Sequence, residues 1–187
     1  MAESDFRLTA APPLPGPVTI GAHRIAPLDL SIVSVAVPQG GYDAAKTALQ
    51  KAYGLDWPGA VESSTSGDLR AISVAPDAIW ILGADAGDAV DKLGGAAYLT
   101  DLTDGHVVLE LEGPDVAAAL ERLTRLDWDR MPDSAATRTQ VEHLSVTILR
   151  PGPGRCLFIA GRSMAGSLLH AVDEVVRNVA ADTAAMR

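Results

Sequence analysis

The densest group of potentially reactive side chains is the stretch Asp101-Leu-Thr-Asp-Gly-His106, which places two carboxylates, a hydroxyl and an imidazole close together. A carboxylate beside a histidine can fix its tautomer and act with it in proton transfer, so Asp101, Thr103 and His106 could form an acid–base site. The same stretch also has the composition of a tight turn, because Asp104-Gly105 is the strongest hairpin signal in the chain. Both interpretations stay open, and we favour the turn.

A second polar pair, Arg162-Ser163, stands where a helix is predicted to begin. The N-terminus of a helix offers free N–H groups and a partial positive charge, so the pair could hold an anion. Serine is also a good N-cap residue, and capping explains the pair about as well. We therefore keep Arg162 and Ser163, with Asp101, Thr103 and His106, as a candidate polar site. No catalytic, cofactor-binding or metal-binding residue is assigned in this chain.

Other familiar site patterns are missing from the sequence. Neither G-x-G-x-x-G after a strand nor G-x-x-x-x-G-K-[ST] occurs, so both phosphate-binding fingerprints are absent. The histidines lack the spacing of metal ligands; they are His23, His106, His143 and His170. The single cysteine, Cys156, excludes an internal disulfide, and its strand-like surroundings favour a small buried apolar residue over a reactive thiol.

Composition limits the partners that the chain can have. Its 187 residues are 48% hydrophobic, which is enough for a core, and carry a net charge of −9. Lysine and arginine are scattered singly, whereas nucleic acids and anionic membrane surfaces require clustered positive charge. We therefore expect no nucleic-acid and no membrane partner, and a protein or a small molecule remains possible.

The location of the protein can also be predicted. No apolar run approaches the roughly 20 residues that a membrane-spanning helix needs. The start of the chain, Met1 to Arg7, has neither the basic region nor the apolar stretch of a signal peptide. The expected location is the cytoplasm.

The first 27 residues differ in composition from the rest. Five of the 12 prolines fall between Pro12 and Pro27, and proline disfavours both helices and central strands. We interpret residues 1–27 as an extended N-terminal arm, which lies in a groove of this or another chain, or else as a partly disordered tail. Ordered structure is expected to begin at Leu28.

Hydrophobic periodicity and turn signals divide the remaining chain into two similar halves. For the first half we predict strands at 28–37, 69–75 and 78–82 and helices at 42–53 and 85–93. For the second half we predict strands at 97–100, 107–112, 139–149 and 156–160, a helix opened by Gly113-Pro114 and a final helix from Ser163.

The two halves read as a repeat. The motif Leu-Asp-Trp follows the first helix in each half, at Leu55–Trp57 and Leu126–Trp128. The prediction is an α+β fold of two pseudo-repeated β-α-β-β-α units of the ferredoxin-like kind, covering 28–95 and 96–187. Such units are expected to give mixed sheets with helices on one face.

Several motifs together resemble a known family. The stretch from Thr100 to Asp115 looks like the strand-to-helix entry of the folate-binding aminomethyltransferase superfamily. A narrower resemblance, to the γ subunits of heterotetrameric sarcosine oxidase, rests on four segments: Leu126–Pro132, Thr137–Gln140, Phe158–Ser163 and Ser167–Leu169. The resemblance implies the aminomethyltransferase fold and a non-catalytic subunit of an oxidoreductase complex.

The resemblance also implies partners and cofactors. In such complexes the α subunit binds NAD and tetrahydrofolate, and the β subunit carries FAD and oxidises sarcosine. FMN lies between them, attached to β, and a δ subunit completes the tetramer. This chain would then hold no cofactor itself, while the complex converts sarcosine to glycine with hydrogen peroxide and formaldehyde or methylene-tetrahydrofolate.

Other functions remain open on the sequence. The chain could belong to a related complex that oxidises or dehydrogenates another N-methyl amino acid. It could also be a free-standing folate-binding protein of the aminomethyltransferase kind, or an interaction module that has lost its complex.

Overall fold

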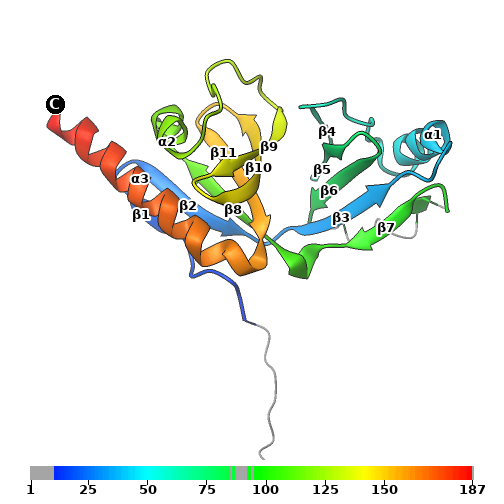
Figure 1. Ribbon diagram of the computed structural model, residues 1–187, viewed down its shortest axis with the longest axis horizontal. Coiled ribbons are helices and arrows are strands. Elements are labelled where there is room, and N and C mark those ends of the chain that lie inside the picture. Colours follow the sequence, from blue (N-terminus) through cyan, green and yellow to red (C-terminus); the bar gives the residue numbers. More distant parts are fainter. Residues whose placement is uncertain (1–10, 85, 87–91, 94, 187) are drawn as a thin grey trace, which may run out of the picture.

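The computed structural model describes residues 11–84, 86, 92–93 and 95–186, and shows an α+β fold with two antiparallel sheets and three α-helices in these ranges (Figure 1). The six-stranded sheet has the order β1 (Val18–Ile20), β2 (His23–Leu28), β8 (His106–Glu112), β11 (Arg155–Gly161), β10 (Leu144–Gly152) and β9 (Ala136–Val141). The five-stranded sheet has the order β4 (Ser63–Ser66), β5 (Leu69–Ala75), β6 (Ala78–Gly83), β3 (Ser31–Ala36) and β7 (Tyr98–Asp101). The helices are α1 (Tyr42–Tyr53), α2 (Val116–Leu123) and α3 (Ala165–Ala185).

The two sheets repeat one strand order, and each contains a strand from outside its own unit. The strands of the two sheets correspond one to one: the order is β4-β5-β6-β3-β7 in one sheet and β9-β10-β11-β8-β2 in the other. The helix α1 follows β3, and α2 follows the corresponding strand β8. The last strand of each series lies outside the unit that supplies the other four, since β7 belongs to the second unit and β2 precedes the first. Residues 96–187 therefore contribute strands to both sheets, whereas residues 28–95 contribute to the five-stranded sheet and add only Leu28 to β2.

Three apolar cores hold the layers together. One lies between the six-stranded sheet and α2 and α3, and a second lies between the five-stranded sheet and α1. The third is where the two sheets face each other, and it is formed by Ile32, Ile72, Leu82, Val108, Ala136, Leu149, Leu157 and Ile159. The helices thus cover the outer faces of the sheets, with α1 at one end of the molecule and α2 and α3 at the other (Figure 1).

The repeated Leu-Asp-Trp motif anchors equivalent positions. Trp57 is buried in the core beneath α1, where its ring meets Tyr42 edge to face at 5.5 Å between centroids. Trp128 is buried in the core beneath α2 and α3, and the guanidinium of Arg150 lies 5.1 Å from its ring centroid. Burying each indole removes a large apolar surface from water at the end of the helix, which fixes the chain as it leaves the helix.

Several predicted boundaries are wrong. Ordered strands begin at Val18 and not at Leu28, because β1 and β2 form an antiparallel hairpin that extends the six-stranded sheet at β8. The predicted strand 139–149 is in fact two strands, β9 and β10, joined by a turn in which Glu142 has a left-handed φ of 53°. The predicted helix at 85–93 lies largely outside the described residues.

The sheets also differ from the expectation. Every strand pair among the described residues is antiparallel, whereas a ferredoxin-like unit was expected to give a mixed sheet. Each unit has one more strand than predicted, since β4 and β9 were not recognised as edge strands. The α+β class is confirmed.

None of the helices in the part of the chain described by the structure is both long enough and apolar enough to cross a membrane.

Candidate functional site

The structure brings part of the candidate polar site together. A cavity of about 430 Å³ lies where the end of β2, the turn before β8 and the start of the 3-10 helix Arg162–Met164 meet. Thr103, His106 and Arg162 line it, with Asp104 and the N-terminal residues 11–13. Asp101 and Ser163 do not line this cavity.

The side chains of Asp101 and Thr103 form hydrogen bonds that hold the turn before β8 in place. Oδ1 of Asp101 accepts the backbone N–H of Thr103 at 2.9 Å, as in an Asx turn. The hydroxyl and the backbone N–H of Thr103 hold the pKa of the Asp101 carboxyl below its ordinary value. Oγ1 of Thr103 also accepts the backbone N–H of Ile32 at 3.0 Å, so the turn is tied to β3.

His106 is held by its own turn and by an aromatic neighbour. Nδ1 of His106 lies 3.2 Å from the carbonyl oxygen of Leu102, and this contact requires the proton on Nδ1 because a carbonyl only accepts. The ring meets Trp80 edge to face, with 4.8 Å between centroids. Within the described ranges no carboxylate forms a hydrogen bond or ion pair with His106, so acid–base chemistry here stays a prediction from the sequence.

The Asp104-Gly105 signal marks a turn but not a hairpin. Residues Thr103–Gly105 form one turn of 3-10 helix. The strands on either side separate, since β7 pairs with β3 in one sheet and β8 pairs with β2 and β11 in the other. The polar stretch thus forms the crossover by which the chain passes between the two sheets.

Arg162 and Ser163 also have structural positions. Nη2 of Arg162 donates to the carbonyl oxygen of Ala11 at 2.7 Å, which ties the N-terminal segment to the start of the last helix. The predicted N-cap at Ser163 is wrong, because α3 begins at Ala165 with Met164 in the N-cap position. Ser163 lies in the preceding 3-10 turn and is exposed.

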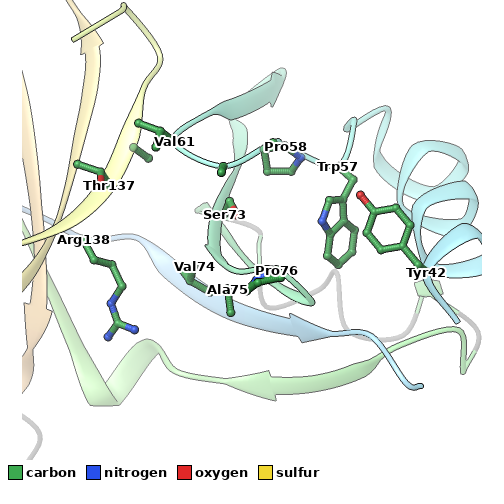
Figure 2. Close-up of a pocket in the computed structure, with 13 residues that line it drawn as sticks. Tyr42, Trp57, Pro58, Val61, Ser73, Val74, Ala75, Pro76, Thr137 and Arg138 are labelled. Atoms are coloured by element: carbon green, nitrogen blue, oxygen red, sulfur yellow. The ribbon is translucent and has the colours of Figure 1, made fainter. Parts of the chain in front are cut away.

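A second cavity, which the sequence analysis did not predict, lies at the junction of the two units. It has a volume of about 460 Å³, and we call it the junction cavity. Figure 2 shows Tyr42 and Trp57 on one side of it and Thr137 and Arg138 of β9 on the other. The remaining walls are residues 58–61 and the end of β5 with its turn, residues 73–76.

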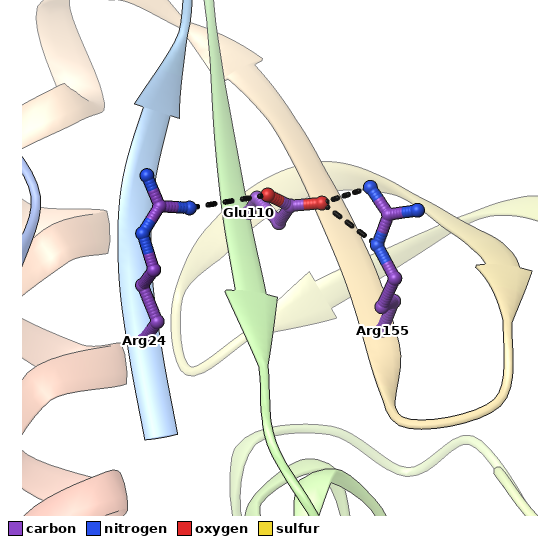
Figure 3. Close-up of polar contacts among 3 residues, drawn as sticks. All are labelled: Arg24, Glu110 and Arg155. Carbon is purple, nitrogen blue, oxygen red and sulfur yellow. Dashed lines mark hydrogen bonds and ion pairs between the residues drawn. The ribbon is translucent and has the colours of Figure 1, made fainter. Parts of the chain in front are cut away.

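A buried ion cluster was also missed. Glu110 of β8 is 4% exposed, and its carboxylate lies between Arg24 of β2 and Arg155 of β11 (Figure 3). Nε and Nη2 of Arg155 both donate to Oε1, and Nη1 of Arg24 lies 3.6 Å from Oε2. No sequence motif marks Glu110, and the structure uses it to join three strands.

The remaining single residues fit structural positions. Cys156 is fully buried, and burial raises the pKa of its thiol, which agrees with the predicted apolar role. His23 is 2% exposed, and neither ring nitrogen has a hydrogen-bond partner within the described part of the chain; Nε2 lies 4.0 Å from Oδ2 of Asp115. Over the described ranges, no group of three or more His, Cys, Asp or Glu side chains could hold a metal ion.

Comparison with known proteins identifies similar structures. A chain of heterotetrameric sarcosine oxidase from Corynebacterium sp. U-96, solved with pyrrole 2-carboxylate, matches with a TM-score of 0.77 and 19% identity, over 87% of this chain and 88% of that chain. The glycine cleavage system aminomethyltransferase T from Bartonella henselae matches with a TM-score of 0.61 and 16% identity, over 82% of this chain and 46% of that chain. No protein-family model and no curated protein matches.

These matches confirm the fold suggested by the sequence motifs. The sarcosine oxidase chain is covered almost end to end, as is this chain, so the two are of similar size. The aminomethyltransferase is less than half covered, so this chain matches only part of that enzyme. At these sequence identities the shared property is the fold alone.

Proposed function

We propose that this chain is a γ-type subunit of a sarcosine oxidase, or of a sibling complex that oxidises another N-methyl amino acid. The observation that carries the proposal is the near-complete mutual coverage with one chain of a heterotetrameric sarcosine oxidase. A fold shared over 88% of a subunit supports a shared position in an assembly more than a shared domain within a longer enzyme does. The motif resemblance in the second half of the chain supports the same assignment.

The contacts of the candidate polar residues support a structural role. Thr103 binds the backbone of β3, His106 contacts Leu102 and Trp80, and Arg162 binds the backbone of Ala11. Side chains that hold the backbone in this way are positioned for folding and are less available to a substrate. In the proposed complex the chemistry belongs to the partner subunits.

The proposed partners are α, β and δ subunits. The α subunit would hold NAD and tetrahydrofolate, and the β subunit would hold FAD and the covalent FMN. This chain would contribute surface and stability to the assembly, while sarcosine loses its methyl group to give glycine. The proposal thus assigns an oxidoreductase complex to the chain and no catalytic residue within it.

A free-standing folate-binding protein is the second candidate. It is favoured by the fold shared with aminomethyltransferase T and by the cavity lined by Thr103, His106 and Arg162. Calorimetry of the isolated chain with tetrahydrofolate separates the two functions. Micromolar binding would favour the second candidate, and no binding would favour the first.

Co-expression tests the proposal directly. The tagged chain is expressed alone and together with the products of its neighbouring genes, which the proposal expects to include flavoprotein subunits. Alone, it should carry no flavin absorbance and oxidise no N-methyl amino acid. With its neighbours, it should co-purify with flavin and with sarcosine-dependent peroxide formation. A tagged chain that retains none of the neighbouring flavoproteins would overturn the proposal.

A further inference from the structure

The junction cavity has the properties of a protein-docking site. Its volume of about 460 Å³ can accept one or two side chains of another molecule. The apolar walls come from both units, because Tyr42 and Trp57 belong to the first half and Ala136 belongs to β9 in the second. A molecule bound here would therefore contact both halves of the repeat.

Two large apolar side chains at this cavity remain in contact with water. Tyr42 is 44% exposed and Val61 is 50% exposed. They lie on opposite sides of the cavity, with Pro58 and Pro76 on the wall between them (Figure 2). Exposed apolar side chains gathered around one hollow mark interaction sites, whereas scattered ones need no explanation.

Val61 also has an unfavourable backbone conformation. Its φ is 63°, in the left-handed region, where a β-branched side chain is a genuine outlier. The carbonyl oxygen of Val61 accepts the backbone N–H of Ala136 at 3.3 Å, and Oγ of the nearby Ser63 donates to the carbonyl oxygen of Ser134 at 2.6 Å. These bonds between the two units hold the strained residue in place, and strain of this kind is concentrated at functional sites.

Arg138 is the single charged residue among the described residues that line the junction cavity. It is exposed, and within the described parts of the chain no carboxylate pairs with it. In a protein of net charge −9, an arginine without a carboxylate partner, across the cavity from the aromatic wall, is a local positive site. Such a site complements a carboxylate on a bound molecule.

We propose that the junction cavity docks a segment of a partner subunit that carries an aromatic or aliphatic side chain next to a carboxylate. The apolar side chain would fill the space between Trp57 and Val61, and the carboxylate would pair with Arg138. Tyrosine, tryptophan and arginine are the residue types that dominate protein–protein hot spots. The inference rests on the proposed function, because it takes the partner to be a subunit of the same complex.

The exposure of the walls distinguishes a partner segment from a small metabolite. A small-molecule site encloses most of its ligand, with its lining side chains already withdrawn from water. Here Tyr42, Val61 and Arg138 are all exposed. A protein segment would cover both the hollow and these side chains.

Binding by matched variants tests the inference. The tagged chain, co-expressed with its flavoprotein neighbours, is compared with Arg138→Glu, Val61→Asn and the control Arg177→Glu. The control makes the same charge reversal on α3, on the outer face of the other sheet. We expect Arg138→Glu and Val61→Asn each to weaken retention about tenfold or more, as loss of a hot spot does. The control should retain the wild-type amount.

Val61→Asn gives a second readout that separates binding from folding. Asparagine tolerates a left-handed φ, so the isolated variant should melt at the wild-type temperature or above it. Loss of binding together with undiminished thermal stability would identify Val61 as a docking residue. A lowered melting temperature with unchanged binding would overturn its assigned role.

The outcomes distinguish the inference from the proposed function. If the wild type and Arg138→Glu retain the flavoprotein equally, the docking inference is overturned and the proposed function stands. If the wild type retains no flavoprotein, the proposed function fails, and NMR titration with N-acetylphenylalanine decides the inference. Saturable shifts of the Arg138 and Trp57 side-chain N–H signals in the wild type, with an unshifted Trp57 signal in Arg138→Glu, would support the site, and unchanged wild-type signals would overturn it.

Discussion

The guanidinium of Arg155 binds the buried carboxylate of Glu110 through two nitrogens, and thereby joins β11 to β8. Arg24 approaches the other carboxylate oxygen from β2, on the opposite side of β8 (Figure 3). The strand β2 precedes the first unit and lies beside β8 in the six-stranded sheet. The ion cluster therefore joins this N-terminal strand to the second unit.

Replacing Glu110 by glutamine should destabilise the fold. Glutamine keeps the shape of the side chain but removes the negative charge that the guanidiniums of Arg24 and Arg155 bind. The Arg24 and Arg155 side chains are 46% and 47% exposed, so water can replace only part of the lost interaction. We expect a loss of about 1–3 kcal/mol in the free energy of unfolding, measured in urea. The control Asp182→Asn breaks the exposed 2.8 Å pair with Arg122 and should cost less than about 1 kcal/mol. Equal costs for the two variants would contradict this account of the cluster.

Gly113 should not tolerate alanine. A Cβ at this position would lie 2.4 Å from Cδ2 of His23, whose ring is buried. Overpacking of this kind costs about 1–3 kcal/mol, which chemical denaturation would detect. The penalty should largely disappear in a His23→Ala background, where the nearest remaining atom of that residue is its Cα at 3.2 Å.

The double-mutant cycle of Gly113→Ala and His23→Ala can contradict this prediction. Gly161→Ala is the control, because a Cβ there meets nothing within 4 Å. If Gly113→Ala lowers the free energy of unfolding by the same amount whether residue 23 is histidine or alanine, the His23 ring is not what excludes a Cβ at residue 113.

Asp101 should give the folded state a small dependence on pH. Its pKa is lowered below the ordinary value of 3.8 by the hydroxyl and N–H of Thr103, so folding favours the ionised form. The resulting stability is present above pH 3.8 and is lost as the pH falls through the lowered value. Because Asp101 is almost fully exposed, the effect should stay below about 1 kcal/mol.

Asp101→Asn separates this charge effect from the turn itself. The amide oxygen can still accept the N–H of Thr103, so the fold should persist while the contribution of residue 101 becomes independent of pH. The difference in unfolding free energy between wild type and variant should therefore shrink from neutral pH towards about pH 2. If the difference in unfolding free energy instead grew as the pH fell, the predicted direction of the Asp101 effect would be wrong.

Local signals in the sequence were sufficient for individual elements. The helix at 42–53 was predicted with both ends correct, because apolar residues recur at helical spacing and Gly54 ends the helix with a left-handed φ of 66°. The strand at 69–75 was likewise predicted with correct ends, from β-branched residues and the turn at Pro76-Asp77.

What the sequence did not reveal depends on contacts between distant residues. The Asp104-Gly105 turn is a genuine local signal, but nothing local determines that β7 joins β3 while β8 joins β2. Glu110 was not recognised as a buried ion-pair residue, because the pattern of β8 says nothing about a neighbouring strand such as β2 that brings Arg24 beside it. The junction cavity also escaped prediction, since its walls come from segments far apart in the chain.

The most direct test of the central claim is sedimentation of the flavoprotein neighbours with and without this chain. If the chain is a subunit of their complex, adding it to the purified flavoprotein should give one faster species that contains both, with sarcosine-dependent peroxide formation in that species. If the flavoprotein sediments identically in its presence and the two proteins remain separate, the proposed function is contradicted.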